Sequence, residues 1–455
     1  MVAEANDWRC PSNFGIHLSH PLYSMWKRAL IQRKDLAVGL LSFIKSLTQD
    51  EPNSSSNSSS VAVARGRNSL RSEQCQAARG QQARAGNQSH VPEVGASVYD
   101  GNRQVRVLGK LLNKGGEGRI YPLSNNGDVL VKIYHPSVLA HERSAMMRNK
   151  LMVMTRMSAM HSGPHFAWPR ILIHAADGKW LGYAMRRAPG HQLQTLCQPQ
   201  LIRERIPHWS RREVVTCAAS FVRLVQEAHA NAIILGDINP GNFLIDPRNC
   251  DVYAIDCDSF QVPDGSNVYP CPVGIPMLMP PELLALDYGK TRRTVEQELF
   301  AVAIMLFRIF MLGLHPYSRT YGEDPVQNLK SGQCALGKGS GCRLPKGPWY
   351  NIWSHLPSYM KELFIRTFRD GHAAPSKRAT LEEWAFALHR YHCDMGKGWF
   401  DLSLVPQQPK SSAYRGRKPL SANANTILGG RSGSKVRESS RPVRKHGMGR
   451  PLQRV

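Results

Sequence analysis

Two acidic residues and one amide in the middle of the chain have the spacing of a phosphoryl-transfer site. Asp237 and Asn242 lie five residues apart in a polar loop, and Asp256 ends the β-like run VYAID fourteen residues after Asn242. In phosphotransferases, one carboxylate orients and deprotonates a hydroxyl, while an amide and a second carboxylate hold Mg²⁺ against nucleotide phosphates. Magnesium keeps several waters, so two protein ligands are enough. The alternative is that Asp237 and Asn242 are turn residues and that Asp256 caps a strand end.

A glycine cluster and a strand lysine precede this loop. The run NKGGEGRIY at 113–121 places Gly115, Gly116 and Gly118 between two expected strands, where glycine lets backbone amides approach phosphate oxygens. Lys132 follows in an alternating strand, and we expect nucleotide phosphates to neutralise its charge. Taken separately, the glycines could form a plain turn and the lysine could face solvent. Their order ahead of the acidic loop favours a nucleotide site.

Hydrophobic periodicity predicts the elements that position these residues. The runs VRVLGKLLNKGGEGRIYPLS and DVLVKIYH alternate and are joined by NNGD, which predicts a β-hairpin, and RILIHAADGKWLGYAMRRA predicts a second hairpin. A helix is predicted over 136–158, beginning at Pro136, and a long helix over RREVVTCAASFVRLVQEAHAN. Later segments are mostly helical, VEQELFAVAIMLFRIFM and YMKELFIRTFRDG being the clearest. The sequence therefore predicts an α+β protein with a small β-rich lobe followed by a larger helical lobe.

Composition divides the chain into four expected segments. Residues 1–50 contain a helix-like segment without an assigned role, and residues 51–100 lack periodic apolar positions, which predicts a disordered linker. The catalytic unit is expected over 101–395 and a basic, disordered tail over 396–455. Because residues 401–455 carry 12 Lys and Arg against 2 Asp and Glu, we expect them to attract nucleic acid non-specifically and in a salt-sensitive way.

The overall composition indicates a compartment. The chain has 455 residues, a net charge of +25 and ten cysteines without a C-x-x-C pair. No signal peptide is recognisable, so we expect a reduced, cytoplasmic setting. The longest apolar run, at 299–314, is interrupted by Arg308 and is short for a bilayer. We therefore expect a buried helix there and no membrane association.

Over about residues 105–393 the chain resembles the protein kinase family. The resemblance implies a two-lobed kinase-like fold in which Asp237 is the catalytic base, Asn242 and Asp256 bind Mg²⁺, and Lys132 fixes the phosphates of ATP. It also implies an ATP site lined by Gly115, Gly116, Gly118, Ile120, Leu130, Lys132 and Leu244.

Several phrases are typical of one bacterial branch of kinase domains that are often fused to helix-hairpin-helix modules. They are KIYHP, GDINPGNFLID, IDCDSFQV, CPVGIPMLMPPEL and MLGLHPYS. Relatives in this branch are commonly encoded beside a PP2C-like phosphatase and a von Willebrand A-like protein, so the resemblance implies those partners. It also implies a structural ion pair between Glu282 of MPPEL and Arg378 of PSKRAT.

Other positions depart from the usual kinase pattern. Gly236 stands where an Arg normally reads an activation-loop phosphate, and Asn239 stands where a Lys normally contacts the transferring phosphate. D-C-D at 256–258 replaces D-F-G, so that Asp258 adds a carboxylate near the metal. Glu298 replaces the Asp that braces the catalytic loop.

A helix of the small lobe usually supplies a Glu that pairs with the strand lysine. Glu142 is the only acidic residue between Lys132 and Asp177, so the resemblance makes Glu142 that partner if one exists. It follows the lysine by only ten residues, and a surface i,i+4 pair is its alternative role.

We therefore expect an ATP- and Mg²⁺-dependent protein kinase that transfers the γ-phosphoryl group to Ser or Thr of a protein substrate. A pseudokinase scaffold is one alternative, motivated by Asn239, Glu298 and the early Glu142. A small-molecule phosphotransferase is another, because Ile275 replaces the Thr usually found beside the base. The third is a nucleic-acid-associated protein that uses its basic tail, with the kinase fold as a sensor.

Overall fold

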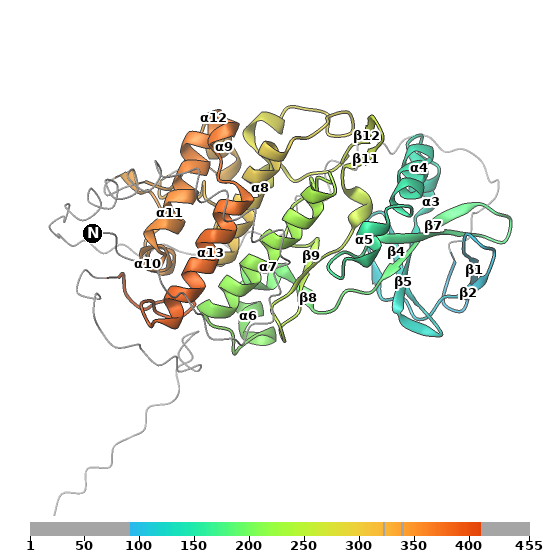
Figure 1. Ribbon diagram of the computed structural model, residues 1–455, viewed down its shortest axis with the longest axis horizontal. Coiled ribbons are helices and arrows are strands. Elements are labelled where there is room, and N and C mark those ends of the chain that lie inside the picture. Colours follow the sequence, from blue (N-terminus) through green and yellow to red (C-terminus); the bar gives the residue numbers. More distant parts are fainter. Residues whose placement is uncertain (1–91, 322–323, 338–340, 411–455) are drawn as a thin grey trace, which may run out of the picture. The chain divides into compact units, whose positions relative to one another are not determined.

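The computed structural model describes residues 92–321, 324–337 and 341–410. The expectations for residues 1–50, for most of the linker and for 411–455 lie outside these residues. The described part contains a β-rich lobe followed by a helical lobe (Figure 1). This arrangement confirms the predicted α+β, two-lobed fold.

Seven antiparallel strands form the sheet of the β-rich lobe, in the order β2-β1-β6-β7-β5-β4-β3. Both predicted hairpins are present, as the pairs β4–β5 and β6–β7. The strands are β1 (Ser97–Tyr99), β2 (Val105–Val107), β3 (Asn113–Lys114), β4 (Gly118–Leu123), β5 (Asn126–Tyr134), β6 (Pro169–His174) and β7 (Trp180–Arg186).

The sheet curls so that the segment after β2 reaches β4. A bridge joins Leu108 to Leu123, and the Ser124 amide donates to the Val107 carbonyl at 2.9 Å. Apolar side chains, among them fully buried Val98, fill the inside of the curl. Because Val98 lies in β1, the expected linker boundary at residue 100 is wrong, and residues 92–100 belong to the lobe.

The single helix predicted over 136–158 is also wrong, because the chain turns twice within it. The structure has α3 (Pro136–Leu139), α4 (Ser144–Met154) and α5 (Ser158–Ser162). At the first break the Arg143 amide donates to the His141 ring at 3.1 Å. This local side-chain acceptor replaces a helical hydrogen bond.

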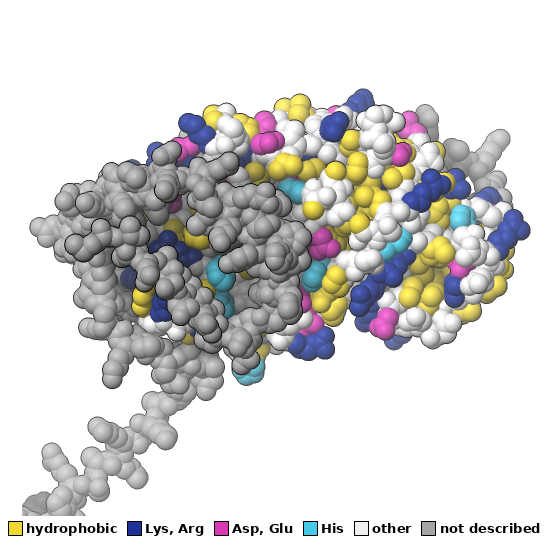
Figure 2. All heavy atoms as spheres, viewed as in Figure 1, with side chains coloured by type: hydrophobic (Ala, Val, Ile, Leu, Met, Phe, Trp, Pro, Cys, Tyr) yellow, Lys and Arg dark blue, Asp and Glu magenta, His cyan; other side chains and the backbone are white. Residues whose placement is uncertain are grey.

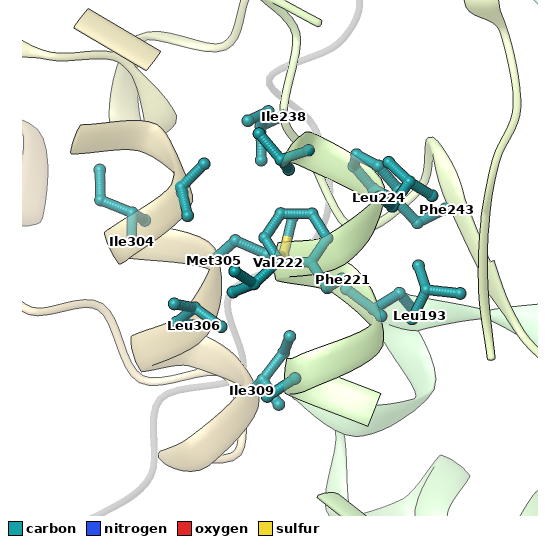
Figure 3. Close-up of a cluster of buried hydrophobic side chains, with 14 of the residues drawn as sticks. Leu193, Phe221, Val222, Leu224, Ile238, Phe243, Ile304, Met305, Leu306 and Ile309 are labelled. Carbon is teal, nitrogen blue, oxygen red and sulfur yellow. The ribbon is translucent and has the colours of Figure 1, made fainter. Parts of the chain in front are cut away.

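The helical lobe is built around two helices that begin with capping boxes. In α7 (Arg211–Ala230) the box is formed by Ser210 and Glu213, and in α8 (Val295–Phe310) by Thr294 and Gln297. Figure 3 shows apolar side chains of both helices packed together between them. Burial of α8 along nearly its whole length confirms the buried helix expected there. No helix among the described residues is long and apolar enough to cross a membrane.

Further α-helices and five short strands complete this lobe. The remaining helices are α6 (Pro199–Arg205), α9 (Pro325–Lys330), α10 (Pro348–His355), α11 (Ser358–Ile365), α12 (Gly371–Ala373) and α13 (Leu381–Gly396). The strands are β8 (His191–Gln192), β9 (Phe243–Ile245), β10 (Val252–Ala254), β11 (Val262–Asp264) and β12 (Asn267–Tyr269). Figure 2 shows Lys and Arg side chains spread among other residue types over the visible face of this unit.

Residues 396–410 belong to the helical lobe, which corrects the expected start of the tail. Leu404 is fully buried, and its carbonyl accepts a hydrogen bond from the buried Arg211 guanidinium. The Arg211 amide donates to the Leu402 carbonyl at 2.8 Å, and the Lys410 amide donates to Ser354 Oγ, also at 2.8 Å. These contacts fix the segment against α7 and α10.

Candidate active site

The structure brings together Asp237, Asn242 and Asp256. The loop after α7 carries Asp237 and Asn242, and the β9–β10 hairpin returns the chain to Asp256. The Ile255 amide donates to the Asn242 carbonyl at 2.9 Å, so that Asn242 lies next to the segment of Asp256. Asn242 Nδ2 donates to Asp237 Oδ2 at 2.9 Å. The three residues selected from their spacing therefore form one cluster.

Asp237 is a half-buried carboxylate held by two amides. Besides Asn242, Asn239 Nδ2 donates to Asp237 Oδ2 at 2.8 Å. Burial raises the pKa of Asp237, although the Asn242 bond and the charge of Arg293 act in the opposite direction. A fixed carboxylate with a raised pKa can accept a proton from a substrate hydroxyl.

Glu298 braces the loop of Asp237 from α8. Its Oε1 accepts the Gly236 amide at 2.7 Å, and its Oε2 lies 2.5 Å from His229 Nε2. The longer side chain at this position therefore still reaches the loop. The replacement of the usual Asp does not remove the brace.

The glycines between β3 and β4 have different roles. A Cβ on Gly118 would lie 2.4 Å from the Ile133 carbonyl, so Gly118 is required for the packing of β4 against β5. Side-chain positions on Gly115 and Gly116 would meet little or nothing, so the backbone there is open to a ligand. Ile120 lies opposite Lys132 in the strand register.

Two apolar residues expected against the adenine ring lie in different lobes. Leu130 is a largely buried residue of β5, and Leu244 is a half-buried residue of β9. Their role in the ATP site stays a prediction.

Lys132 already has carboxylate partners from the protein. Its side chain is 6% exposed, and Nζ lies 2.8 Å from Asp258 Oδ2, 3.4 Å from Glu117 Oε2 and 3.5 Å from Asp256 Oδ1. Burial acts to lower the pKa of Lys132, but the three carboxylates outweigh it and raise the pKa. Lys132 therefore has counter-charges within the protein, and its expected contact with nucleotide phosphates stays a prediction.

Both carboxylate oxygens of Asp258 contact Lys132 Nζ. Asp258 also accepts hydrogen bonds from the Tyr134 hydroxyl at 2.6 Å and from the Tyr183 hydroxyl at 2.9 Å. Burial would raise the pKa of Asp258, but Lys132 and the two hydroxyls hold it below its usual value. The sequence shows the additional acid, but nothing in the sequence signals that two tyrosines from β5 and β7 converge on it.

Glu142 does not take the role expected of it. It lies exposed in the turn before α4 and is not among the acidic residues that contact Lys132. The α4 residue turned toward the site is Lys150, which is 5% exposed and carries a charge that interacts with Asp258 and Glu117. Burial lowers the pKa of Lys150 to about 8.

Arg293 occupies the space of the side chain that Gly236 lacks. A Cβ on Gly236 would lie 2.7 Å from Arg293 Nη1. Arg293 Nη2 donates to the carbonyls of Val273 at 2.6 Å and Cys271 at 3.3 Å. An arginine distant in sequence therefore supplies a cation near Asp237, a contact that sequence spacing could not predict.

The predicted ion pair between Glu282 and Arg378 is present. Arg378 donates from Nη1 and Nη2 to the two Glu282 oxygens at 2.7 and 2.9 Å, and its side chain is fully buried. A bidentate pair of this kind fixes the end of the segment that begins at Asp256.

The donor set fits a nucleotide with Mg²⁺. Asp256 is 47% exposed at its side chain, and the Asn242 amide nitrogen faces Asp237, which directs its oxygen elsewhere. These are the hard oxygen donors that Mg²⁺ uses together with water and phosphates. Within the described ranges no group of three or more His, Cys, Asp or Glu forms a closed metal cage, and such a cage is not required here.

Fold and site together define a two-lobed architecture, in which a β-strand lysine faces an Asp–Asn–Asp cluster of the helical lobe. No family model matches the chain. Two curated relatives, each named protein kinase YegI, come from Escherichia coli strain K12 and Escherichia coli O157:H7. The first is 27% identical over 300 residues, which cover 64% of this chain and 45% of the relative. The second is 27% identical over 301 residues, covering 64% and 46%.

A calcium-dependent protein kinase 22 from Oryza sativa subsp. japonica is 24% identical over 198 residues, covering 42% of this chain and 31% of the relative. The chain thus spans less than half the length of the curated relatives it matches. These similarities, together with the two-lobed fold, support membership of the protein kinase superfamily.

Proposed function

We propose that this chain is a protein kinase that uses ATP and Mg²⁺ to phosphorylate Ser or Thr of a protein substrate. The observation that carries the proposal is the hydrogen-bonded cluster of Asp237 and Asn242 beside Asp256, facing Lys132. Bound ATP supplies the phosphoryl group and Mg²⁺ offsets its charge. Cytoplasmic location, and regulation by a PP2C-like phosphatase and a von Willebrand A-like partner, remain parts of this proposal.

Each residue has a stated task in this reaction. Asp237 orients the acceptor hydroxyl and takes its proton, while the amides of Asn239 and Asn242 hold the carboxylate in place. Asn242 and Asp256 would hold the metal, and Lys132 would contact the phosphates below the open backbone of Gly115 and Gly116. Leu130, Leu244, Ile120 and Gly118 would shape the nucleotide site.

The brace on the catalytic loop favours an active enzyme over a pseudokinase. Glu298 bonds the loop amide and Arg293 fills the space beside Gly236, so both departures in sequence are compensated in structure. Asn239 adds a bond to the base in place of the usual lysine charge.

Asp237→Asn tests the proposal. The substitution keeps the hydrogen-bonding shape but cannot accept the proton, so we expect phosphate transfer to a generic protein to fall by about 100-fold or more. MgADP binding should be kept, because Asp237 does not contact Lys132 in the structure.

Asp264→Asn in β11 is the matched control, because Asp264 is an exposed acid outside the cluster. Phosphoamino-acid analysis of the product should show phosphoserine or phosphothreonine. Equal transfer by Asp237→Asn and wild type would contradict the assigned base, and no transfer by the wild type would favour a pseudokinase.

A further inference from the structure

The acidic residue that pairs with Lys132 fixes the position of this lysine in the site. Resting on the proposed function, we propose that Asp258, and not an acidic residue of α4, positions Lys132 for nucleotide. Asp258 thereby couples the strand of Lys132 to the segment of Asp256.

Three donors converge on the Asp258 carboxylate. Lys132 Nζ lies 2.8 Å from Oδ2 and 3.1 Å from Oδ1, and the hydroxyls of Tyr134 and Tyr183 each bond one oxygen. The Asp258 side chain is 4% exposed. A buried ion pair holds its geometry only when its remaining hydrogen-bonding positions are satisfied, and this condition is met here.

Helix α4 cannot supply the acid. Its sequence, SAMMRNKLMVM, contains no Asp or Glu, and Glu142 lies exposed before its start. The residue that α4 turns toward the site is the cation Lys150, which is repelled by Lys132. Helix α4 therefore presents a cation to Lys132, where a helix glutamate would present an anion.

The contact between Asp258 and Lys132 connects two distant segments of the chain. Asp258 lies in the single turn Cys257–Ser259, two residues after Asp256, whereas Lys132, Tyr134 and Tyr183 lie in β5 and β7. One carboxylate thus joins the sheet of the β-rich lobe to the segment proposed to bind metal. Glu117, at 3.4 Å and 56% exposed, is a peripheral partner of Lys132. We infer that Lys132 stays in place without any movement of α4.

A double-mutant cycle without nucleotide tests the ion pair in the full chain. Lys132→Met should lower the melting temperature, because it leaves the Asp258 carboxylate buried and unpaired. Asp258→Asn added to Lys132→Met should recover part of that loss. Glu142→Gln added to Lys132→Met should recover none. Additive losses for Lys132→Met and Asp258→Asn would overturn the pairing.

MgADP binding, measured on folded variants, tests positioning. Asp258→Asn should weaken MgADP binding by about tenfold or more, while Glu142→Gln stays within about twofold of wild type. If Asp258→Asn does not fold, the pair Tyr134→Phe and Tyr183→Phe carries the test, with a weakening of about threefold or more expected.

MgADP binding that depends on Glu142 but not on Asp258 would overturn the inference. Tighter MgADP binding by Asp258→Asn would also overturn it, because Asp258 would then compete with the nucleotide for Lys132. Because binding rather than transfer is measured, a protein that binds MgADP normally but transfers no phosphate would contradict only the proposed function.

Discussion

At the scale of single residues, buried charge controls this site. Lys132 is surrounded by carboxylates, whereas no carboxylate of the described residues forms an ion pair with Lys150. The two lysines therefore contribute to stability in opposite ways. The charged form of Lys132 is stabilised by its carboxylate partners. The charged form of Lys150 is destabilised by burial, and the nearby charges offset this effect only in part.

Lys150→Met is therefore expected to stabilise the protein at neutral pH, by about 3 kcal/mol at most. The folded pKa of Lys150, about 8, lies below its ordinary value of 10.5. Between these pH values the unfolded chain binds more protons, so this residue's contribution to the free energy of unfolding rises with pH. Urea unfolding of wild type and Lys150→Met from pH 7 to pH 10 measures it.

The difference in unfolding free energy between wild type and Lys150→Met reports the contribution of Lys150, because both proteins keep the other groups around it. These groups are Cys271, Asp258, Glu117 and Lys132. The advantage of Lys150→Met should shrink as pH rises. A variant that is less stable than wild type at pH 7 would show that the ammonium has a favourable partner.

Sequence spacing was sufficient for the residues that lie close together in the chain. Asp237, Asn242 and Asp256 lie in one cluster because one loop and one hairpin connect them. Asp258, Tyr183 and Arg293 could not be assigned in this way. Their contacts join segments between 75 and 126 residues apart, or fill the space left by a glycine.

At the scale of elements, the segment from Asp256 to Glu282 is held at several points without a phosphate. Arg293 bonds the carbonyls of Cys271 and Val273, and Arg378 holds Glu282. Five prolines between 270 and 281 further restrict its backbone. The segment is therefore expected to be ordered before any modification.

Ser266→Ala combined with Tyr269→Phe should consequently leave turnover within about threefold of wild type, or roughly 0.7 kcal/mol in barrier. Ser266 is exposed near the tip of the β11–β12 hairpin, away from Arg293's carbonyl contacts. Steady-state phosphate transfer measures the effect. A loss of about 100-fold that an acidic residue at 266 restores would show that this hairpin is a phosphorylation switch.

Helical periodicity predicted α7 and α8 because each has a broad apolar face and a capping box. It failed at 136–158, where apolar residues recur at helical spacing but the backbone turns at His141. Helical spacing of apolar residues indicates which residues are buried. It does not reveal a break in the helix when the same residues stay buried on both sides of the break.

At the scale of the whole molecule, the folded unit extends beyond the predicted limits at both ends. Residues 92–100 complete the sheet, and residues 401–410 pack on α7 and α10. Composition did not reveal this, because both short segments adjoin stretches of low apolar content.

Deletion of 411–455 should leave the free energy of unfolding unchanged. Deletion of 401–455 should lower the free energy of unfolding by about 3 kcal/mol or more, and with it the melting temperature. The longer deletion removes buried Leu404 and the carbonyls that accept hydrogen bonds from buried Arg211. Thermal denaturation of the two truncated proteins measures the difference.

Both deletions should weaken non-specific DNA binding and reduce its salt dependence, because both remove most of the basic tail. Equal stability of the two truncated proteins would contradict the structural role of 401–410. Undiminished DNA binding at raised salt would place a nucleic-acid site elsewhere.

We propose that the cluster of Asp237, Asn242 and Asp256 transfers phosphate from ATP. Incubation of the full chain with γ-labelled ATP and Mg²⁺, with and without a generic protein, tests it most directly. We expect label on the chain or the added protein for wild type and for the control Asp264→Ala, and none for Asp256→Ala. Equal labelling by Asp256→Ala, or no labelling by the wild type, would contradict it.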